Sequence, residues 1–230
     1  MKKMVTEKGE EMEKVNTHIA GLVWSILLLV LLAGCSSAYY GAMEKMGKHK
    51  RDIMVDRVEN ARDSQQQAQE QFKSALERFD SVVKLQETDL KKAYDSLNGE
   101  YEQCEDAAAT VSSRIEQVED VADALFDEWE DELGQYQSKE LKRSSKAQLK
   151  QTKARYHEMI ASMRHAEKSM EPVLLIFRDN VLFLKHNLNA QAIGSLQSEF
   201  ANLKGEIDVL LERMNTAIAS SNDFIKDIKQ

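Results

Sequence analysis

Proline, glycine, cysteine and aromatic residues are all scarce in this sequence. Its 230 residues include one proline, nine glycines and two cysteines, and aromatic residues make up 7% of the chain. So few cysteines exclude a disulfide-stabilised scaffold, and so few prolines and glycines exclude a fold built from many short turns. Charged residues reach 30%, and with abundant alanine, glutamate, glutamine, lysine and leucine they are typical of long helices.

Motifs for the common enzymatic chemistries are absent as well. The sequence contains no glycine-rich phosphate-binding loop, and no histidine stands three residues after a glutamate or four residues from another histidine. Those spacings build di-iron bundles and zinc protease sites. We therefore predict that the protein is not an enzyme and carries no cofactor. A net charge of −8 also argues against nucleic acid as a partner, because nonspecific binding needs a basic surface.

The one long hydrophobic run lies near the N-terminus, at residues 19–35. It has the apolar core and the small-residue end of a secretory signal. The run ends in Leu-Leu-Ala-Gly-Cys at residues 31–35, which resembles a bacterial lipobox. The resemblance implies removal of residues 1–34 as a signal peptide and a diacylglycerol on the sulfur of Cys35. Several acyl chains on one residue are sufficient for stable membrane anchoring.

This leader leaves alternatives open. An uncleaved transmembrane helix would make the protein a single-pass inner-membrane protein, although the run lies at the short end of the ~17 to 25 residues that span a bilayer. Residues 1–18 carry four glutamates against four lysines, which is acidic for a signal, so we hypothesise that translation starts at Met12. An aspartate directly after the lipidated cysteine would resemble a signal for retention in the inner membrane, but this sequence has Ser36 at that position. We expect a lipoprotein at the inner leaflet of the outer membrane, facing the periplasm.

Residues 35–52 are predicted to be the lipidated cysteine and a short tether, and residues 53–230 a single elongated helical coiled-coil domain. Apolar residues in this domain recur at spacings of three and four over four runs, as in helices that bury a narrow stripe. Four helices of about 40 residues would each be ~60 Å long. Because short links make neighbours antiparallel, we predict an elongated antiparallel helical bundle, or folded-back coiled coil, of about four long helices. The stripes include Met54, Val58, Phe72, Phe79, Leu97, Cys104, Val111, Ile115, Leu125, Tyr156, Met163, Phe177, Leu203, Ile207, Leu210 and Met214.

Local signals mark the expected ends of these helices. The first stripe loses its phase at residues 85–89, where either a helix break or one continuous helix is compatible with the sequence. Gly134 followed by Ser138 indicates a helix end and a new N-cap. Pro172 lies inside the third run, so a kink is expected there.

Residues 173–188 are apolar on more than one face, so we expect other helices to surround this segment. A ligand-binding or hydrolytic site in this region is an alternative function. Arg178, Asp179 and Lys185 are the polar side chains that could serve it, although they are equally typical of surface charges on a buried helix.

Cys104 is the one thiol that remains if Cys35 is lipidated. It falls on an apolar stripe, where cysteine behaves as a small hydrophobic residue. We predict a buried and unreactive thiol.

Acidic residues crowd the end of the second run, and basic residues crowd the start of the third. Residues 100–132 hold 13 acids and one base, whereas residues 139–155 hold seven bases and one acid. Because the link between them folds the runs back on each other, mutual pairing across the hairpin is the simplest explanation. The alternative is a docking surface for a charged partner. Its candidate residues are Asp127, Glu128, Glu130, Asp131, Glu132, Lys139, Lys142, Arg143 and Lys146. The acidic cluster lacks the loop of a calcium-binding EF-hand, so we predict no metal site.

Two stretches resemble a known family. They are Asp-Glu-Trp-Glu-Asp-Glu-Leu at residues 127–133 and Met-Glu-Pro-Val-Leu-Leu-Ile-Phe-Arg-Asp-Asn-Val-Leu-Phe-Leu-Lys-His-Asn-Leu-Asn-Ala at residues 170–190. Both are similar to an uncharacterised proteobacterial lipoprotein family, domain-of-unknown-function family 2959, which implies no activity and no functional residues. With the anchor motif, the sequence predicts a non-enzymatic, lipid-anchored scaffold or adaptor of the cell envelope. Its expected partners are the membrane, an unknown envelope protein or another copy of itself.

Overall fold

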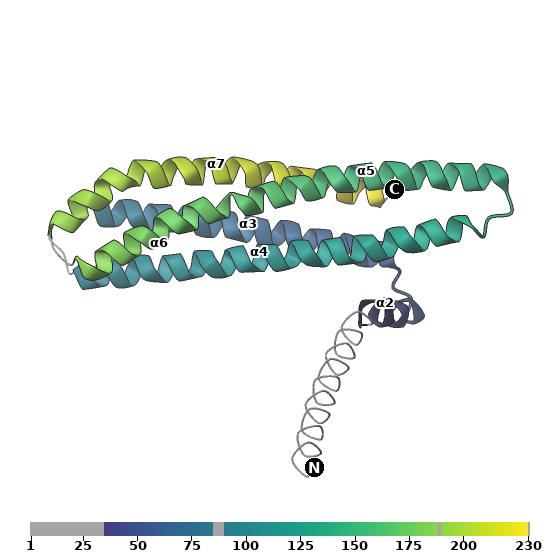
Figure 1. The fold of residues 1–230 in the computed structure, drawn as a ribbon, viewed down its shortest axis with the longest axis horizontal. Coiled ribbons are helices and arrows are strands. Elements are labelled where there is room, and N and C mark those ends of the chain that lie inside the picture. Colours follow the sequence, from purple (N-terminus) through teal and green to yellow (C-terminus); the bar gives the residue numbers. More distant parts are fainter. Residues whose placement is uncertain (1–34, 85–89, 188–189, 230) are drawn as a thin grey trace, which may run out of the picture. The chain divides into compact units, whose positions relative to one another are not determined.

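A computed structural model describes residues 35–84, 90–187 and 190–229 (Figure 1). The predicted signal peptide, the start at Met12 and the open question at residues 85–89 lie outside these described residues. Of the helices in the described ranges, none is both long enough and apolar enough to span a bilayer.

Contacts divide the chain into two compact units, residues 1–49 and residues 50–230. The described part of the first unit contains helix α2 (Cys35–Lys45), so the stretch predicted as a tether includes a regular helix. Its composition explains this, because alanine, methionine, glutamate and lysine favour helix and no proline interrupts them. Gly47 follows the helix with a φ of 81°, a left-handed conformation that suits glycine at a helix C-terminus.

Five helices make up the second unit, and the described residues contain no strand. They are α3 (Lys50–Val83), α4 (Leu90–Leu133), α5 (Lys139–Lys168), α6 (Met170–His186) and α7 (Ala190–Ile228). α3 packs against α4 and α7, and α5 and α6 together pack against the same two helices (Figure 1). The predicted all-α helical bundle is confirmed, with the third predicted helix divided into α5 and α6.

Most residues of the predicted apolar stripes form the core, but Tyr136 and Leu141, which also continue these runs, are 40% and 60% exposed near the α4–α5 turn. Aromatic rings join three of the helices near one end, where the Phe79 ring meets Phe177 edge-on at 6.1 Å and stacks on Phe200 at 6.0 Å. Burial of each large apolar side chain contributes roughly 1.5 to 3 kcal/mol. Fully buried residues include Met54, Val58, Phe72, Phe79, Leu97, Cys104, Val111, Ile115, Met163, Phe177, Leu203, Ile207, Leu210 and Met214.

The break between α5 and α6 lies at Ser169, three residues before Pro172. Proline has no amide hydrogen to donate to the Lys168 carbonyl, and its ring would collide with that group. Ser169 is buried and bonded on both sides, since its Oγ donates to the His165 carbonyl at 2.8 Å and accepts from Arg213 Nη1 at 2.6 Å. The kink predicted from Pro172 is therefore present and is held by α7.

The predicted turn between α4 and α5 is also confirmed. α4 ends at Leu133, and the amide of Gly134 donates to the Asp131 carbonyl at 3.0 Å. Ser138 caps α5, because its Oγ accepts from the amide of Leu141 at 3.3 Å. The side-chain cap satisfies one of the amides that the first turn of a helix leaves free.

The expectation that other helices surround residues 173–188 is wrong. α6 buries one side, with Val173, Phe177 and Leu184, but Leu175 and Leu182 on the other side are 43% and 46% exposed. Helical periodicity records that both sides are apolar, but it does not record how many neighbours the helix has. α6 has the two flanking helices α4 and α7, so its outer side stays open.

Gln65 is a polar residue inside this core. Its side chain is fully buried on α3, and neither Oε1 nor Nε2 has a hydrogen-bond partner in the part of the chain that the structure describes. An unsatisfied buried amide costs about 1 to 3 kcal/mol.

We therefore expect Gln65→Leu to raise the free energy of unfolding by about 1 to 3 kcal/mol, because it replaces this amide with an apolar side chain of similar volume. Gln66→Leu is the matched control, since Gln66 is exposed on the next position of α3. Urea unfolding measures both changes. A loss of stability in Gln65→Leu would show that the amide is satisfied in the folded protein.

Candidate functional site at the tip of the α4–α5 hairpin

The α4–α5 hairpin extends beyond the other helices of its unit (Figure 1). α3 begins beside it, where Lys50 Nζ lies 2.8 Å from Glu128 Oε1. α7 ends at the same level, since the Ile228 carbonyl accepts from Arg51 Nε at 2.7 Å and Ile228 shares a small cavity with Gln148. Beyond this level, in the described part of the second unit, α4 and α5 pack mainly on each other, and we call residues 128–148, from this level outward, the hairpin tip.

Aromatic and polar contacts fix the two helices to each other at the base of the hairpin tip. Trp129 Nε1 donates to Ser145 Oγ at 2.8 Å. The rings of Phe126 and Tyr156 meet edge-on at 5.4 Å, and the ammonium of Lys153 lies 5.3 Å from the centre of the Phe126 ring. Edge-on aromatic pairs and cations over rings are both favourable arrangements.

Two ion pairs cross the hairpin. Lys153 Nζ lies 2.6 Å from Glu130 Oε1, and Arg164 pairs with Glu119 further down. On each helix the two paired residues are separated by eleven positions, which is about three turns. The hydrogen bonds that the Arg164 guanidinium donates to Glu119 raise its pKa, and burial of the guanidinium opposes this effect. Part of the predicted mutual pairing therefore exists, and it aligns the two helices.

Most of the predicted docking residues, however, take no part in this pairing. Glu128 and Glu130 have the partners Lys50 and Lys153, as described. The others form no ion pair within the described part of the chain, and all of them are exposed. These residues are Asp127, Asp131, Glu132, Lys139, Lys142, Arg143 and Lys146. The hairpin tip thus presents charges of both signs to its surroundings.

A groove of about 640 Å³ lies beside these charges. Leu133 and Leu149 are buried beneath it, and Ala147 is exposed at its surface. This volume lies within the roughly 300 to 1,000 Å³ of ordinary binding pockets. Its basic rim comes from Arg143, Lys146, Lys150 and Lys153, with Glu130 as the acid. The sequence prediction included two of these four bases, Arg143 and Lys146. It did not include the apolar floor, although Leu133 and Leu149 are apolar residues on either side of the predicted turn.

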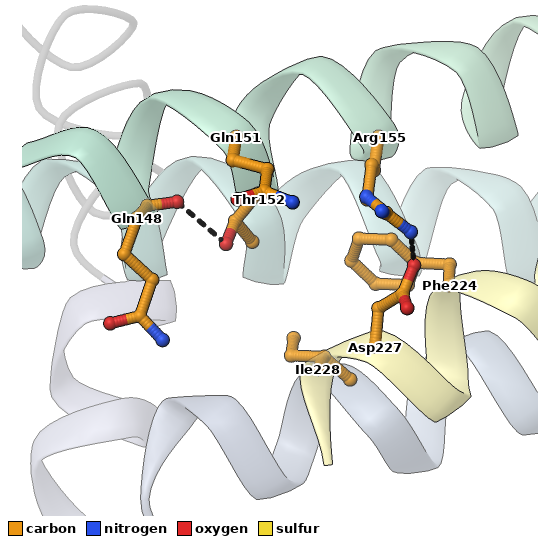
Figure 2. A pocket seen from close by; sticks show the side chains of 7 residues that line it. All are labelled: Gln148, Gln151, Thr152, Arg155, Phe224, Asp227 and Ile228. Atoms are coloured by element: carbon orange, nitrogen blue, oxygen red, sulfur yellow. Dashed lines mark hydrogen bonds and ion pairs between the residues drawn. The ribbon is translucent and has the colours of Figure 1, made fainter. Parts of the chain in front are cut away.

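A second, smaller cavity lies between α5 and the end of α7 (Figure 2). Its volume is about 200 Å³, which is small for a ligand pocket. Figure 2 shows Arg155 and Asp227 directed at one another across it and joined as an ion pair. Because these charges satisfy each other, the cavity is better explained as part of the helix interface. Sequence reasoning missed it, since nothing local relates two residues so distant in the chain.

The alternative site at residues 173–188 is open in the structure. Arg178, Asp179 and Lys185 are all exposed, and Arg178 Nη2 lies 3.5 Å from Asp179 Oδ1. A groove of about 500 Å³ runs beside them between α6 and α7. Within the described residues no group of three or more His, Cys, Asp or Glu side chains is placed to hold a metal ion.

Cys104 is fully buried on α4. Burial raises the pKa of its thiol to about 12, and the nearby Glu100 carboxylate adds to the effect. The Sγ atom lies 3.9 Å from the Gln71 carbonyl of α3. The thiol is therefore protonated at neutral pH, and it contributes to the core as an apolar group.

We expect iodoacetamide to alkylate Cys104 at pH 8 at least about a hundredfold more slowly in the native protein than in urea, because the thiolate is the reactive form. Mass spectrometry of the Cys104 peptide measures both rates. The raised pKa also means that the unfolded thiol ionises first, so the free energy of unfolding should fall as pH rises from about 9 towards 12. Equal alkylation rates would contradict the burial of this side chain.

Comparison with known proteins identifies the chain by its sequence. The family model described as "Protein of unknown function (DUF2959)" matches residues 39–228, which include all five helices of the bundle. No curated protein and no solved structure matches the chain. The match covers most of the sequence and agrees with the resemblance at residues 127–133 and 170–190. The chain therefore belongs to domain-of-unknown-function family 2959.

Proposed function

We propose that this protein is a lipid-anchored, non-enzymatic scaffold or adaptor of the bacterial cell envelope that acts through protein–protein contact. The observation that carries the proposal is the hairpin tip, where an apolar groove is bordered by three exposed bases without ion-pair partners in the described chain and by the pair of Lys153 and Glu130. The three bases are Arg143, Lys146 and Lys150. A surface that combines an apolar floor with a charged rim has the composition of a protein interface.

The chemistry of the groove indicates the kind of partner. Its floor is apolar, so the partner must bring apolar side chains to replace water there. Arg143, Lys146, Lys150 and Lys153 surround that floor. Complementary charges steer encounter and fix orientation more than they increase affinity. The occupant we propose is an acidic, amphipathic helical segment of an envelope protein.

The anchor motif supports the location. A cysteine that directly follows an apolar run and small residues resembles a lipobox, and acylation of Cys35 would hold the body at a membrane surface. Ser36 next to it favours the outer membrane, inner leaflet, with the bundle in the periplasm. The alternative is an uncleaved span at residues 19–35 in the inner membrane.

Replacing the anchor residue tests the location. We expect Cys35→Ser to abolish incorporation of a radiolabelled lipid precursor and to leave residues 1–34 attached, as read by intact mass. Ser36→Asp is the matched control, which should keep the lipid but move the protein from outer-membrane to inner-membrane fractions. Unchanged lipid incorporation and membrane retention in Cys35→Ser would contradict the lipoprotein assignment.

Charge reversal tests the groove. A photo-crosslinking amino acid at Ala147, activated in native membranes, should give a discrete protein adduct. We expect Arg143→Glu with Lys146→Glu to reduce that adduct about tenfold, because like charges across an interface are strongly unfavourable. Lys73→Glu with Lys91→Glu is the matched control, since both lysines are exposed elsewhere in the bundle and the net charge changes equally. Crosslinking to lipid alone, or an equal loss in the control, would contradict a protein partner.

A further inference from the structure

We propose that α2 lies along the surface of the phospholipid bilayer, with its exposed apolar side against the headgroups. This inference rests on the proposed lipid anchor and deepens it, because it names the surface that binds the membrane beside the acylated cysteine. α2 is then a membrane-binding helix, whereas the sequence alone predicted a tether.

α2 carries an exposed apolar side. Tyr39 is 43% exposed and Met46 is 71% exposed, and Ala42 between them is exposed as well. These three residues follow one another at spacings of three and four, so they lie on one side of the helix. Met46 comes directly after the last helical residue, and its amide still donates to the Met43 carbonyl at 3.0 Å, so the helical turn continues through it.

Cys35 belongs to the same side of α2 by its position. It is the first residue of the helix and precedes Tyr39 by four residues, which continues the spacing of the apolar residues towards the anchor. One side of α2 therefore combines the site of acylation with Tyr39, Ala42 and Met46. This combination is the reason to choose the bilayer as the occupant, because acyl chains on Cys35 would hold this side within reach of the headgroups.

The charged residues of α2 fit this orientation. Glu44 falls near the opposite side of the helix, where its carboxylate faces away from the membrane. Lys45 and Lys48 are exposed at the end of the helix, and lysines near a membrane surface attract anionic headgroups by about 1 kcal/mol each. A helix this short binds a bilayer weakly by itself. An anchor on its first residue makes the contact intramolecular, so a weak contact is sufficient.

A depth measurement on the full-length mature protein tests the orientation. Met46→Cys provides a site for an environment-sensitive fluorophore, because the sulfur of Cys35 is acylated in this proposal and Cys104 is buried and protonated. The labelled protein is inserted into vesicles of phosphatidylethanolamine and phosphatidylglycerol that contain a lipid with a nitroxide on its headgroup. We expect the nitroxide to quench this fluorophore at least about threefold, since the apolar side of an interfacial helix lies within the headgroup boundary.

Gly41→Cys is the matched control. Gly41 is closer to Cys35 in the chain but falls near the opposite side of α2, and a side chain that starts there has open space around it in the described structure. We expect the fluorophore at Gly41 to be quenched less than the one at Met46. A helix standing upright on its anchor would give the reverse order, because Gly41 would be ~9 Å and Met46 ~16 Å from Cys35 along the helix axis. The reverse order, or equal quenching, would overturn the proposal.

Charge substitutions test the apolar side itself. With the fluorophore at Ala42→Cys, Tyr39→Glu together with Met46→Glu should reduce quenching about threefold, because carboxylates stay in water and are repelled by anionic headgroups. Leu175→Glu with Val209→Glu is the matched control, since both residues are exposed apolar residues of the bundle, and it should leave quenching unchanged. Equal quenching in the two variants would contradict binding through the apolar side of α2.

Labelling of the unsubstituted protein separates this proposal from the anchor on which it rests. The mature protein should take up no dye, because acylation blocks Cys35 and burial protects Cys104. Dye on Cys35 would overturn the lipid anchor and this arrangement with it. Equal quenching at Met46 and Gly41 in a protein whose Cys35 is acylated would overturn the arrangement alone.

Discussion

The narrow apolar stripe on each long helix is the constraint on which the rest of this structure depends. A helix that is apolar along one side gains stability only where another helix covers that side. In this protein α3 covers the stripes of α4 and α7, and α5 with α6 packs against the same two helices from the other side. Large buried apolar side chains contribute roughly 1.5 to 3 kcal/mol each, whereas exposed ion pairs contribute about 0 to 1. The interior therefore holds the bundle together, and its abundant surface charges are available for other uses.

The helices of the bundle end at different levels, and this determines which surface charges lack a neighbouring helix to pair with. α3 begins and α7 ends near one level of the α4–α5 hairpin, so the hairpin tip consists of two helices. Two helices cannot neutralise the charges that both present outwards, and seven of the nine predicted docking residues have no ion-pair partner in the described chain. The hairpin tip therefore has a surface whose chemistry suits a partner. α6 has a related imbalance, since it is short and apolar on two sides but has helices on one.

The apolar stripes and the helix ends could be predicted from the sequence, because each depends on residues that are close together in the chain. The stripe through Leu97, Cys104 and Val111 is recognised by its spacing of seven residues. Gly134, Ser138 and Pro172 each end, cap or interrupt the helical turn in which they lie. The exposure of Leu175 and Leu182 could not be predicted, because periodicity identifies apolar sides without counting neighbours. The pair formed by Arg155 and Asp227 depends on where α7 ends against α5, and the groove at Leu133 and Leu149 depends on the packing of two helices. Such contacts arise only from the assembled bundle.

Amide hydrogen exchange on the full-length protein is the most direct test of the claim that the hairpin tip is a two-helix extension of a stable bundle. Protection against exchange follows the number of packed neighbours and the depth of burial. Amides at residues 139–147 should exchange at least about tenfold faster than amides at residues 156–166 of the same helix, which α4 and α7 both cover. Uniform protection along α5 would contradict this account, because it would mean that the tip is covered and its charges are not free to bind a partner.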